Sequence, residues 1–303
     1  MNKNRLGQSD LYVSEVGFGS MSLPDDEQSS IRLIHHALDS GVNFIDTADL
    51  YGRGRVEDLV GKALTGKRQD VILATKVGNR WEADKPGWHW DATRAYIKEA
   101  VKNSLRRLGT DYIDLYQLHG GMIEDDFDDT VRAFEELQQE GYIRWYGISS
   151  IRPNVIRRFA EHANIVSVMM QYNILDRRPE ECCLDFLLQK QISVIARGPL
   201  AKGALSTSME QRLEETGYLD YSKPEILYLG QHLRTLTSSE CGLTQLALRY
   251  PLSHPAVATV VPGASRLEQL RENLAVASCH PLSDDQLAQI QAWSKTSVYQ
   301  QHR

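Results

Sequence analysis

The sequence is poor in several features that would mark particular classes of protein. Its four cysteines include no Cys-x-x-Cys spacing, so neither a disulfide framework nor a zinc site is indicated. The apolar runs, such as 71–74 and 274–277, are far shorter than the roughly 18–20 residues of a membrane-spanning helix. With 34 basic and 40 acidic side chains, the formal net charge is −6. This balance gives no electrostatic signature for nucleic acid or an anionic membrane as a partner.

The remaining composition is that of an ordinary globular enzyme, with 42% hydrophobic and 24% charged residues. Residues 1–6 lack the apolar stretch of a secretory signal, so we expect a cytoplasmic protein with reduced thiols. No spacing among the nine histidines resembles a metal site, and we expect none. The length of 303 residues allows two domains at roughly 150 residues each, but single α/β barrels of this size are common. Because no change in composition marks a linker, we expect one domain over 1–303.

Short apolar runs alternate with helix-period runs along the whole chain. The apolar runs are hydrophobic on both faces, which is typical of parallel strands covered by helices. Eight such units predict a closed (β/α)8 TIM barrel in preference to an open sheet. An N-terminal β-hairpin from 5–7 and 11–13, and an extra C-terminal helix at 284–295, complete the predicted fold. The predicted strands are 13–17, 44–47, 71–77, 112–119, 143–149, 165–171, 192–196 and 258–261.

Two connections, 78–91 and 198–224, are unusually long, and loops of that length in a compact barrel are usually functional. The first contains Trp81, Trp88 and Trp90, which either line a substrate pocket or fasten the loop to the barrel rim. The segment 17–22 reads Gly-Phe-Gly-Ser-Met-Ser and lacks the βαβ context of a dinucleotide fingerprint. We interpret it as a tight first βα loop that borders the pocket.

Ionisable side chains stand where predicted strands end, which is where a TIM barrel places its active site. Asp46 ends one strand and is followed by Tyr51, whereas Lys76 and His119 end the next two strands. Left unpaired at the mouth of an apolar barrel, these groups would be destabilising, so we expect them to contact one another. Lys76, paired to Asp46, would lower the pKa of the Tyr51 phenol from its usual value near 10. Together with His119, the cluster forms a proton donor and an oxyanion clamp for a carbonyl undergoing reduction.

These residues carry a resemblance to the aldo-keto reductases. Asp46, Tyr51, Lys76 and His119 match the catalytic tetrad of that family, and 44–52, Phe-Ile-Asp-Thr-Ala-Asp-Leu-Tyr-Gly, matches its signature stretch. The likeness covers the chain from 5–11 to 261–273. Within the family, the chain is similar to the bacterial enzymes described as general oxidoreductases. It implies NAD(P)H bound across the strand ends and reduction of an aldehyde or ketone to an alcohol by hydride transfer, with Tyr51 as general acid.

The resemblance also implies a cofactor site. Ser149 and Gln171 match positions that hold the nicotinamide carboxamide, and Ser150 replaces the usual asparagine. Arg197 stands where many members stack an aromatic ring, and a planar guanidinium can also stack. The expected preference for NADPH over NADH rests on Arg266, which stands at the start of a predicted helix, where backbone N–H groups favour binding of a phosphate. The further positions implied for the cofactor are Pro199, Leu200, Gly263, Ser265, Gln269 and Asn273.

Two other functions remain open at this point. Lys76 alone is compatible with a Schiff-base lysine of an aldolase-type barrel lyase. The fold also serves as a nicotinamide-binding sensor or regulatory subunit in some relatives. Asp49 lies close to Asp46 but is interpreted as capping or pinning its loop. A small carbonyl compound is the expected partner, whereas its identity and the oligomeric state are beyond the sequence.

Overall fold

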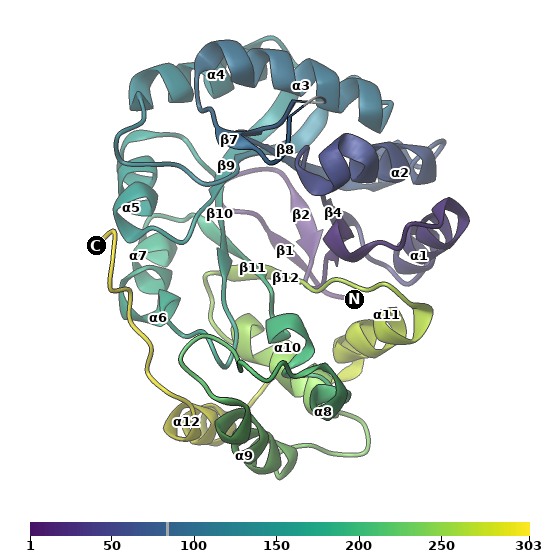
Figure 1. The fold of residues 1–303 in the computed structure, drawn as a ribbon, viewed down its shortest axis with the longest axis vertical. Coiled ribbons are helices and arrows are strands. Elements are labelled where there is room, and N and C mark those ends of the chain that lie inside the picture. Colours follow the sequence, from purple (N-terminus) through teal and green to yellow (C-terminus); the bar gives the residue numbers. More distant parts are fainter. Residues whose placement is uncertain (83–84) are drawn as a thin grey trace.

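Eight parallel strands form the centre of the molecule in the computed structural model, which describes residues 1–82 and 85–303 (Figure 1). They follow one another around the ring in chain order, each paired to its neighbours, and helices surround them. The predicted TIM barrel is therefore confirmed. The strands are β3 (Phe18–Gly19), β4 (Phe44–Asp46), β5 (Ile72–Val77), β8 (Ile113–Leu118), β9 (Ile143–Ser149), β10 (Ser167–Gln171), β11 (Ser193–Arg197) and β12 (Val257–Val261).

Backbone hydrogen bonds between the first and last strand regions close the ring. The Gly17 amide donates to the Val260 carbonyl at 2.8 Å, and the Val260 amide donates to the Glu15 carbonyl at 3.0 Å. A side chain at Gly17 would put its Cβ 2.7 Å from the ring of Phe44, so this close approach requires glycine. The predicted first strand, 13–17, is displaced: it combines the end of β2 (Tyr12–Ser14) with residues 15–17, which pair with Val260 just before the barrel strand β3 (Phe18–Gly19). The boundary is hidden in the sequence because Val13, Val16 and Phe18 are all buried.

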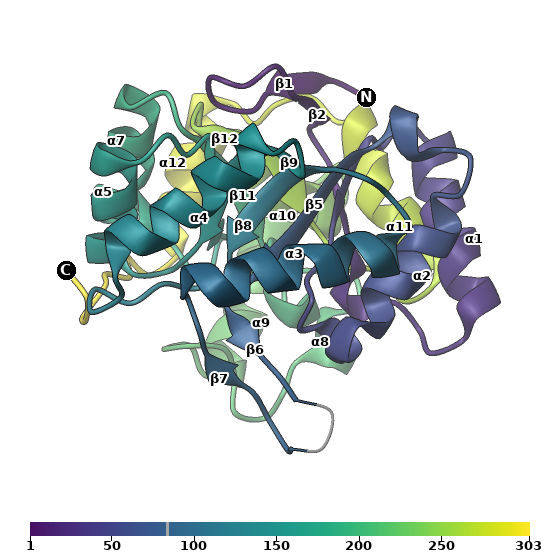
Figure 2. The same ribbon diagram turned by 90° about the horizontal axis from the view of Figure 1, so that it is seen from above.

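The predicted N-terminal hairpin is present as β1 (Lys3–Arg5) paired antiparallel with β2 (Tyr12–Ser14). Its buried Leu6, Leu11 and Val13 pack with Phe44 and Leu115 inside the barrel, at the end formed by the amino ends of the strands. A second hairpin, β6 (Asn79–Arg80) with β7 (His89–Trp90), projects from the opposite end of the barrel (Figure 2). The N-terminal hairpin thus closes one end of the barrel, and the long loops lie at the other end.

Helices cover the outer face of the barrel; α1 to α5 each bury one face, whereas α10 is buried on all sides. Side chains cap several of their first turns, as Asp26 does by accepting from the Ser29 amide at 2.7 Å. The predicted helix at 180–189 divides into two at Cys183, and a short helix, α8, forms within 198–224. The helices are α1 (Glu27–Asp39), α2 (Arg55–Ala63), α3 (Arg94–Leu108), α4 (Phe127–Gln139), α5 (Pro153–His162), α6 (Pro179–Cys182), α7 (Leu184–Gln189), α8 (Met209–Arg212), α9 (Lys223–Arg234), α10 (Leu243–Leu252), α11 (Leu267–Leu274) and α12 (Asp284–Trp293).

The predicted extra C-terminal helix corresponds to α12. Beyond it, the chain returns across the molecule to α5, where the Asn154 amide donates to the His302 carbonyl at 2.8 Å. Within the part of the chain that the structure describes, no helix is long and apolar enough to cross a membrane.

Candidate active site

The four predicted tetrad residues meet at the carboxyl ends of three neighbouring strands. Asp46 ends β4, Lys76 lies near the end of β5, and His119 directly follows β8. Tyr51 opens the 3-10 turn η2 (Tyr51–Gly54) after β4. Because these parallel strands are adjacent in the ring, residues far apart in sequence come into one cluster.

Lys76 is the centre of this cluster. Its ammonium nitrogen donates to Asp46 Oδ2 at 2.7 Å, to the Thr47 carbonyl at 2.7 Å and to the Tyr51 hydroxyl oxygen at 3.3 Å. Burial by itself would lower the pKa of Lys76, but Asp46 and Tyr51 outweigh burial and raise it. Lys76 is therefore a fully buried ammonium with three oxygen acceptors, and it offers no free amine for the Schiff base of a lyase.

Asp46 shares this burial. Burial raises the pKa of Asp46, and the ammonium of Lys76 acts against that rise. We regard the ionised pair as the working state, because all three N–H groups of the Lys76 ammonium donate hydrogen bonds to oxygen atoms. The second carboxylate oxygen, Oδ1, and the amide of Gln117 on β8 are both buried, and the amide lies near enough to Asp46 to lower its pKa. Gln117 is a neighbour of the cluster that sequence reasoning missed, since nothing in its strand distinguishes it from a core position.

His119 stands edge-on to Tyr51, with ring centroids 6.0 Å apart. Burial, together with the positive charges of Lys76 and Arg197, lowers the pKa of His119 to about 3. The imidazole is accordingly neutral at working pH, so it carries one N–H as a hydrogen-bond donor without a charge.

A cavity of about 1850 Å³ opens above the cluster and extends to the start of α11. Tyr51 and His119 line it, as does Gly263 in the loop before α11. The first βα loop borders it through Gly19, Met21 and Ser22, as the sequence predicts. The C-terminal segment 296–302 forms another wall, and no sequence signal pointed to this polar tail.

The cavity brings together most of the residues predicted to hold a cofactor. Ser265 and Arg266 lie outside its wall, exposed on the loop before α11. The Ser265 hydroxyl donates to Gln269 Oε1 at 3.1 Å, while Gln269 Nε2 is buried without a partner. The Asn273 amide donates to the Gly263 carbonyl at 3.2 Å. The predicted positions that line the cavity are Ser149, Ser150, Gln171, Arg197, Pro199, Leu200, Gly263, Gln269 and Asn273.

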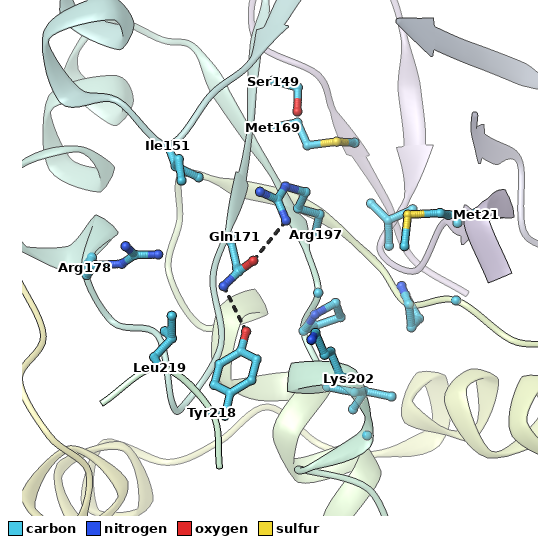
Figure 3. Close-up of a pocket in the computed structure, with 18 of the residues that line it drawn as sticks. Met21, Ser149, Ile151, Met169, Gln171, Arg178, Arg197, Lys202, Tyr218 and Leu219 are labelled. Atoms are coloured by element: carbon cyan, nitrogen blue, oxygen red, sulfur yellow. Dashed lines mark hydrogen bonds between the residues drawn. The ribbon is translucent and has the colours of Figure 1, made fainter. Parts of the chain in front are cut away.

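Arg197 and Gln171 belong to a line of hydrogen bonds across the cavity wall (Figure 3). Arg197 Nη1 donates to Gln171 Oε1 at 3.0 Å, and Gln171 Nε2 donates to the Tyr218 hydroxyl at 2.9 Å. Gln171 Nε2 also donates to the buried Asp176 at 2.9 Å. Sequence reasoning missed Tyr218, although its loop, 198–224, was singled out by length. The amide of Gln171 is thus occupied on both sides by protein groups.

The three tryptophans of the loop 78–91 divide between the two roles considered for them. Trp88 lines the cavity. Trp81 Nε1 donates to the Asp49 carbonyl at 3.1 Å, and Trp90 Nε1 donates to Asp125 at 2.8 Å. Trp81 and Trp90 therefore fasten the loop, and only Trp88 is placed to meet a substrate.

Comparison with known proteins identifies the family of the chain. The model of the Aldo/keto reductase family matches residues 15–295, and the chain belongs to this family of oxidoreductases. It is 50% identical to the uncharacterized oxidoreductase YqkF of Bacillus subtilis (strain 168), over 100% of both chains. The holo form of aldo-keto reductase AKR11C1 from Bacillus halodurans is similar with a TM-score of 0.95 and 54% identity, over 100% of this chain and 99% of that one. The apo form gives a TM-score of 0.86 and 50% identity over the same shares.

Proposed function

We propose that residues 1–303 work as one domain that reduces aldehydes or ketones to alcohols with NADPH. The observation that carries this proposal is the contact of the Lys76 ammonium with both Asp46 and the Tyr51 hydroxyl beside a large cavity. Such an arrangement suits proton donation to an oxygen that gains negative charge during reduction.

The cavity has the form and the free polar groups that a dinucleotide needs. Its lining includes Ser149 and Gln171, and also Gly263 and Gln269, whose Nε2 is buried without a partner within residues 1–82 and 85–303. At Gly263 a Cβ would lie 2.5 Å from Ser22 Oγ, so the backbone there can approach closely only as glycine. The greater likeness to the holo form of AKR11C1 than to its apo form also supports a cofactor-ready arrangement.

Bound NADPH supplies the hydride. Tyr51 donates the proton: its oxygen accepts from Lys76, which leaves the phenolic hydrogen free to point into the cavity. Lys76, held by Asp46, stabilises the phenolate that this donation leaves behind. The neutral imidazole of His119 orients the carbonyl oxygen toward Tyr51. Arg197 stands beside the nicotinamide position, with stacking by its guanidinium as a further proposed contact.

The preference for NADPH over NADH rests on the loop before α11. Arg266 is the N-cap residue of α11 and is exposed, and it makes no ion pair within residues 1–82 and 85–303. A free guanidinium beside a helix N-terminus suits the 2′-phosphate that distinguishes the two cofactors. The four cysteines are free thiols, so we place the enzyme in the reducing cytoplasm.

The test is Tyr51→Phe, assayed with NADPH and a reactive nitrobenzaldehyde. We expect the variant to bind NADPH normally and to lose activity by about 10²- to 10⁴-fold, the usual contribution of a general acid. Tyr12→Phe, at an exposed position of the N-terminal hairpin, is the matched control and should retain full activity. Undiminished turnover by Tyr51→Phe would remove the tyrosine from the mechanism. NADPH bound by the wild type but oxidised by no carbonyl in a single-turnover panel would instead favour the sensor function.

A further inference from the structure

A second group of buried polar side chains lies behind the tetrad, where α2 and α3 pack against the barrel. Asp49 follows β4 and is 2% exposed, and Glu57 of α2 is 0% exposed. Thr75 of β5 and Tyr116 of β8 are also fully buried. None of these side chains has a role in the mechanism described above.

Glu57 is fully compensated as a carboxylate. Its Oε1 accepts from the Thr75 hydroxyl at 2.6 Å, and its Oε2 accepts from Arg107 Nε at 2.7 Å. The Arg107 guanidinium nitrogen Nη2 is also 2.6 Å from Oε2. Two nitrogens of Arg107 thus contact the same oxygen of Glu57, in an ion pair that uses the charge of this arginine.

Asp49 has no comparable partner. Its Oδ2 accepts from the Tyr96 hydroxyl at the long distance of 3.5 Å, and the backbone amide of Leu50 also acts to lower its pKa. Its Oδ1 is buried without a side-chain or backbone partner within residues 1–82 and 85–303. An isolated carboxylate in such a place is strongly destabilised, and the usual response is to bind a proton. The charged and titratable groups that face it are Glu57 from α2, Tyr96 and Arg107 from α3, Lys76 from β5 and Tyr116 from β8, with Arg80 5.1 Å from the Tyr96 ring.

The balance of these neighbours favours the neutral acid. Burial, and next the negative charge of Glu57, raise the pKa of Asp49 to about 8, although Arg107 and Lys76 act in the opposite direction. The same surroundings raise the pKa of Tyr116, again mainly by burial.

Asp49 is also joined to the tetrad through the backbone. It lies two residues before Tyr51, its amide donates to the Lys76 carbonyl at 3.4 Å, and its carbonyl accepts from Trp81. Glu57 binds Thr75, the residue next to Lys76. A change of charge at Asp49 therefore acts directly behind the two residues that handle the proton.

We propose that Asp49 is a positioning residue that is protonated in the working enzyme, and that its ionisation slows carbonyl reduction by placing an uncompensated negative charge behind Tyr51 and Lys76. The inference rests on the proposed function for its effect on turnover. The physical reason is that a nearby negative charge disfavours the phenolate that Tyr51 leaves on donating its proton.

The first test needs no turnover. Urea unfolding of the wild type and of Asp49→Asn is measured from pH 5 to pH 8. An acid whose pKa is raised on folding stabilises the folded state fully below its unfolded pKa near 3.8, and this contribution is lost as the pH rises through about 8. The unfolding constant of the wild type, divided by that of Asp49→Asn, should therefore rise with pH by up to about tenfold per unit.

The control for this test is Asp58→Asn, an exposed neighbour on α2. Its ratio to the wild type should be nearly constant with pH. An ionised and well-paired Asp49 would have a folded pKa at or below its unfolded value near 3.8, so the ratio of the two unfolding constants would stay nearly constant from pH 5 to pH 8, as in the control. That outcome would overturn the proposal.

The second test measures the rate of a single turnover with NADPH and nitrobenzaldehyde between pH 6.5 and pH 9.5. We expect the wild-type rate to fall by about three- to tenfold through pH 8, as a like charge enters the site. Asp49→Asn, which imitates the neutral acid, should keep its rate over the same range. If the variant keeps the alkaline fall, the positioning role is wrong. If no carbonyl oxidises NADPH at all, the proposed function fails, while the unfolding test still decides the protonation of Asp49.

Discussion

The two ends of the proposed cofactor site are built in different ways. At the tetrad end, Lys76 and Asp46 are buried and joined by short hydrogen bonds to each other and to the backbone. At the α11 end, Ser265 and Arg266 are exposed; Ser265 donates to Gln269 of α11, and Arg266 makes no ion pair within residues 1–82 and 85–303. The difference indicates that proton transfer depends on a preorganised cluster shielded from water, whereas recognition of a charged phosphate works from an open surface.

The largest effect is expected from breaking the buried end. Lys76→Met removes the partner of Asp46 and the donor to Tyr51. We expect activity to fall by about 10²- to 10⁴-fold, and the loss of one member of a buried ion pair to cost about 3–5 kcal/mol of stability. Nitrobenzaldehyde reduction and urea unfolding measure the two effects. Lys62→Met, at an exposed ion pair with Glu27, should change neither appreciably.

The double variant Asp46→Asn with Lys76→Met sharpens this prediction. Because it removes the stranded carboxylate as well, it should recover part of the lost stability but none of the activity. A double variant no more stable than Lys76→Met would show that the ion pair is not the source of the cost.

At the open end, Arg266→Ala should act on cofactor choice and not on chemistry. We expect kcat/KM for NADPH to fall by about ten- to a hundredfold, the value of a charge-assisted hydrogen bond, with NADH unaffected. Arg32→Ala, on the exposed face of α1, serves as the control. An equal loss with both cofactors would assign Arg266 to a part that NADPH and NADH share.

A smaller effect is expected between the two ends, at Tyr218→Phe. The hydroxyl accepts from Gln171 Nε2 at 2.9 Å and from Asn173 Nδ2 at 3.3 Å, so its removal leaves two donors short of an acceptor. The KM for NADPH should rise by about three- to tenfold while kcat stays within a factor of about two. Steady-state kinetics decide this, with the exposed Tyr228→Phe as the matched change. A fall in kcat at unchanged KM would place Tyr218 in the chemical step.

The smallest effect concerns His119, for which we expect kcat to stay constant with pH. Because the pKa of His119 is lowered to about 3, its imidazole is neutral throughout the range from pH 5 to pH 7. The kcat of the wild type should therefore be flat there, within a factor of about two. A transition near pH 6.5 that disappears in His119→Asn would show that the imidazole changes its charge during use.

The sequence predicted the barrel well because its evidence is local. Each strand, such as 143–149, is short and apolar on both faces, and each intervening helix has its own period. The boundary at residues 13–18 was wrong because Val13, Val16 and Phe18 are all buried, the first in the hairpin and the others in the barrel wall. A hydrophobic pattern records burial but not which element provides it.

The candidate site was predictable where motif and strand end coincide, as for Asp46, Tyr51, Lys76 and His119. It was not predictable for Tyr218, a loop residue whose partner Gln171 lies 47 residues away on β10. The exposure of Arg266 and the use of both sides of the Gln171 amide were equally hidden. Such pairings depend on where two distant segments pack.

The sequence by itself determined the alternation that closes the barrel and the identity of the four residues at its mouth, because both follow from spacing along the chain. Only the tertiary structure decided which oxygens Lys76 binds, and that Arg107 forms its ion pair with Glu57 and not with Asp49. Those outcomes are set by distances between side chains on different elements, and charge in a protein interior is governed by such distances and not by order along the chain.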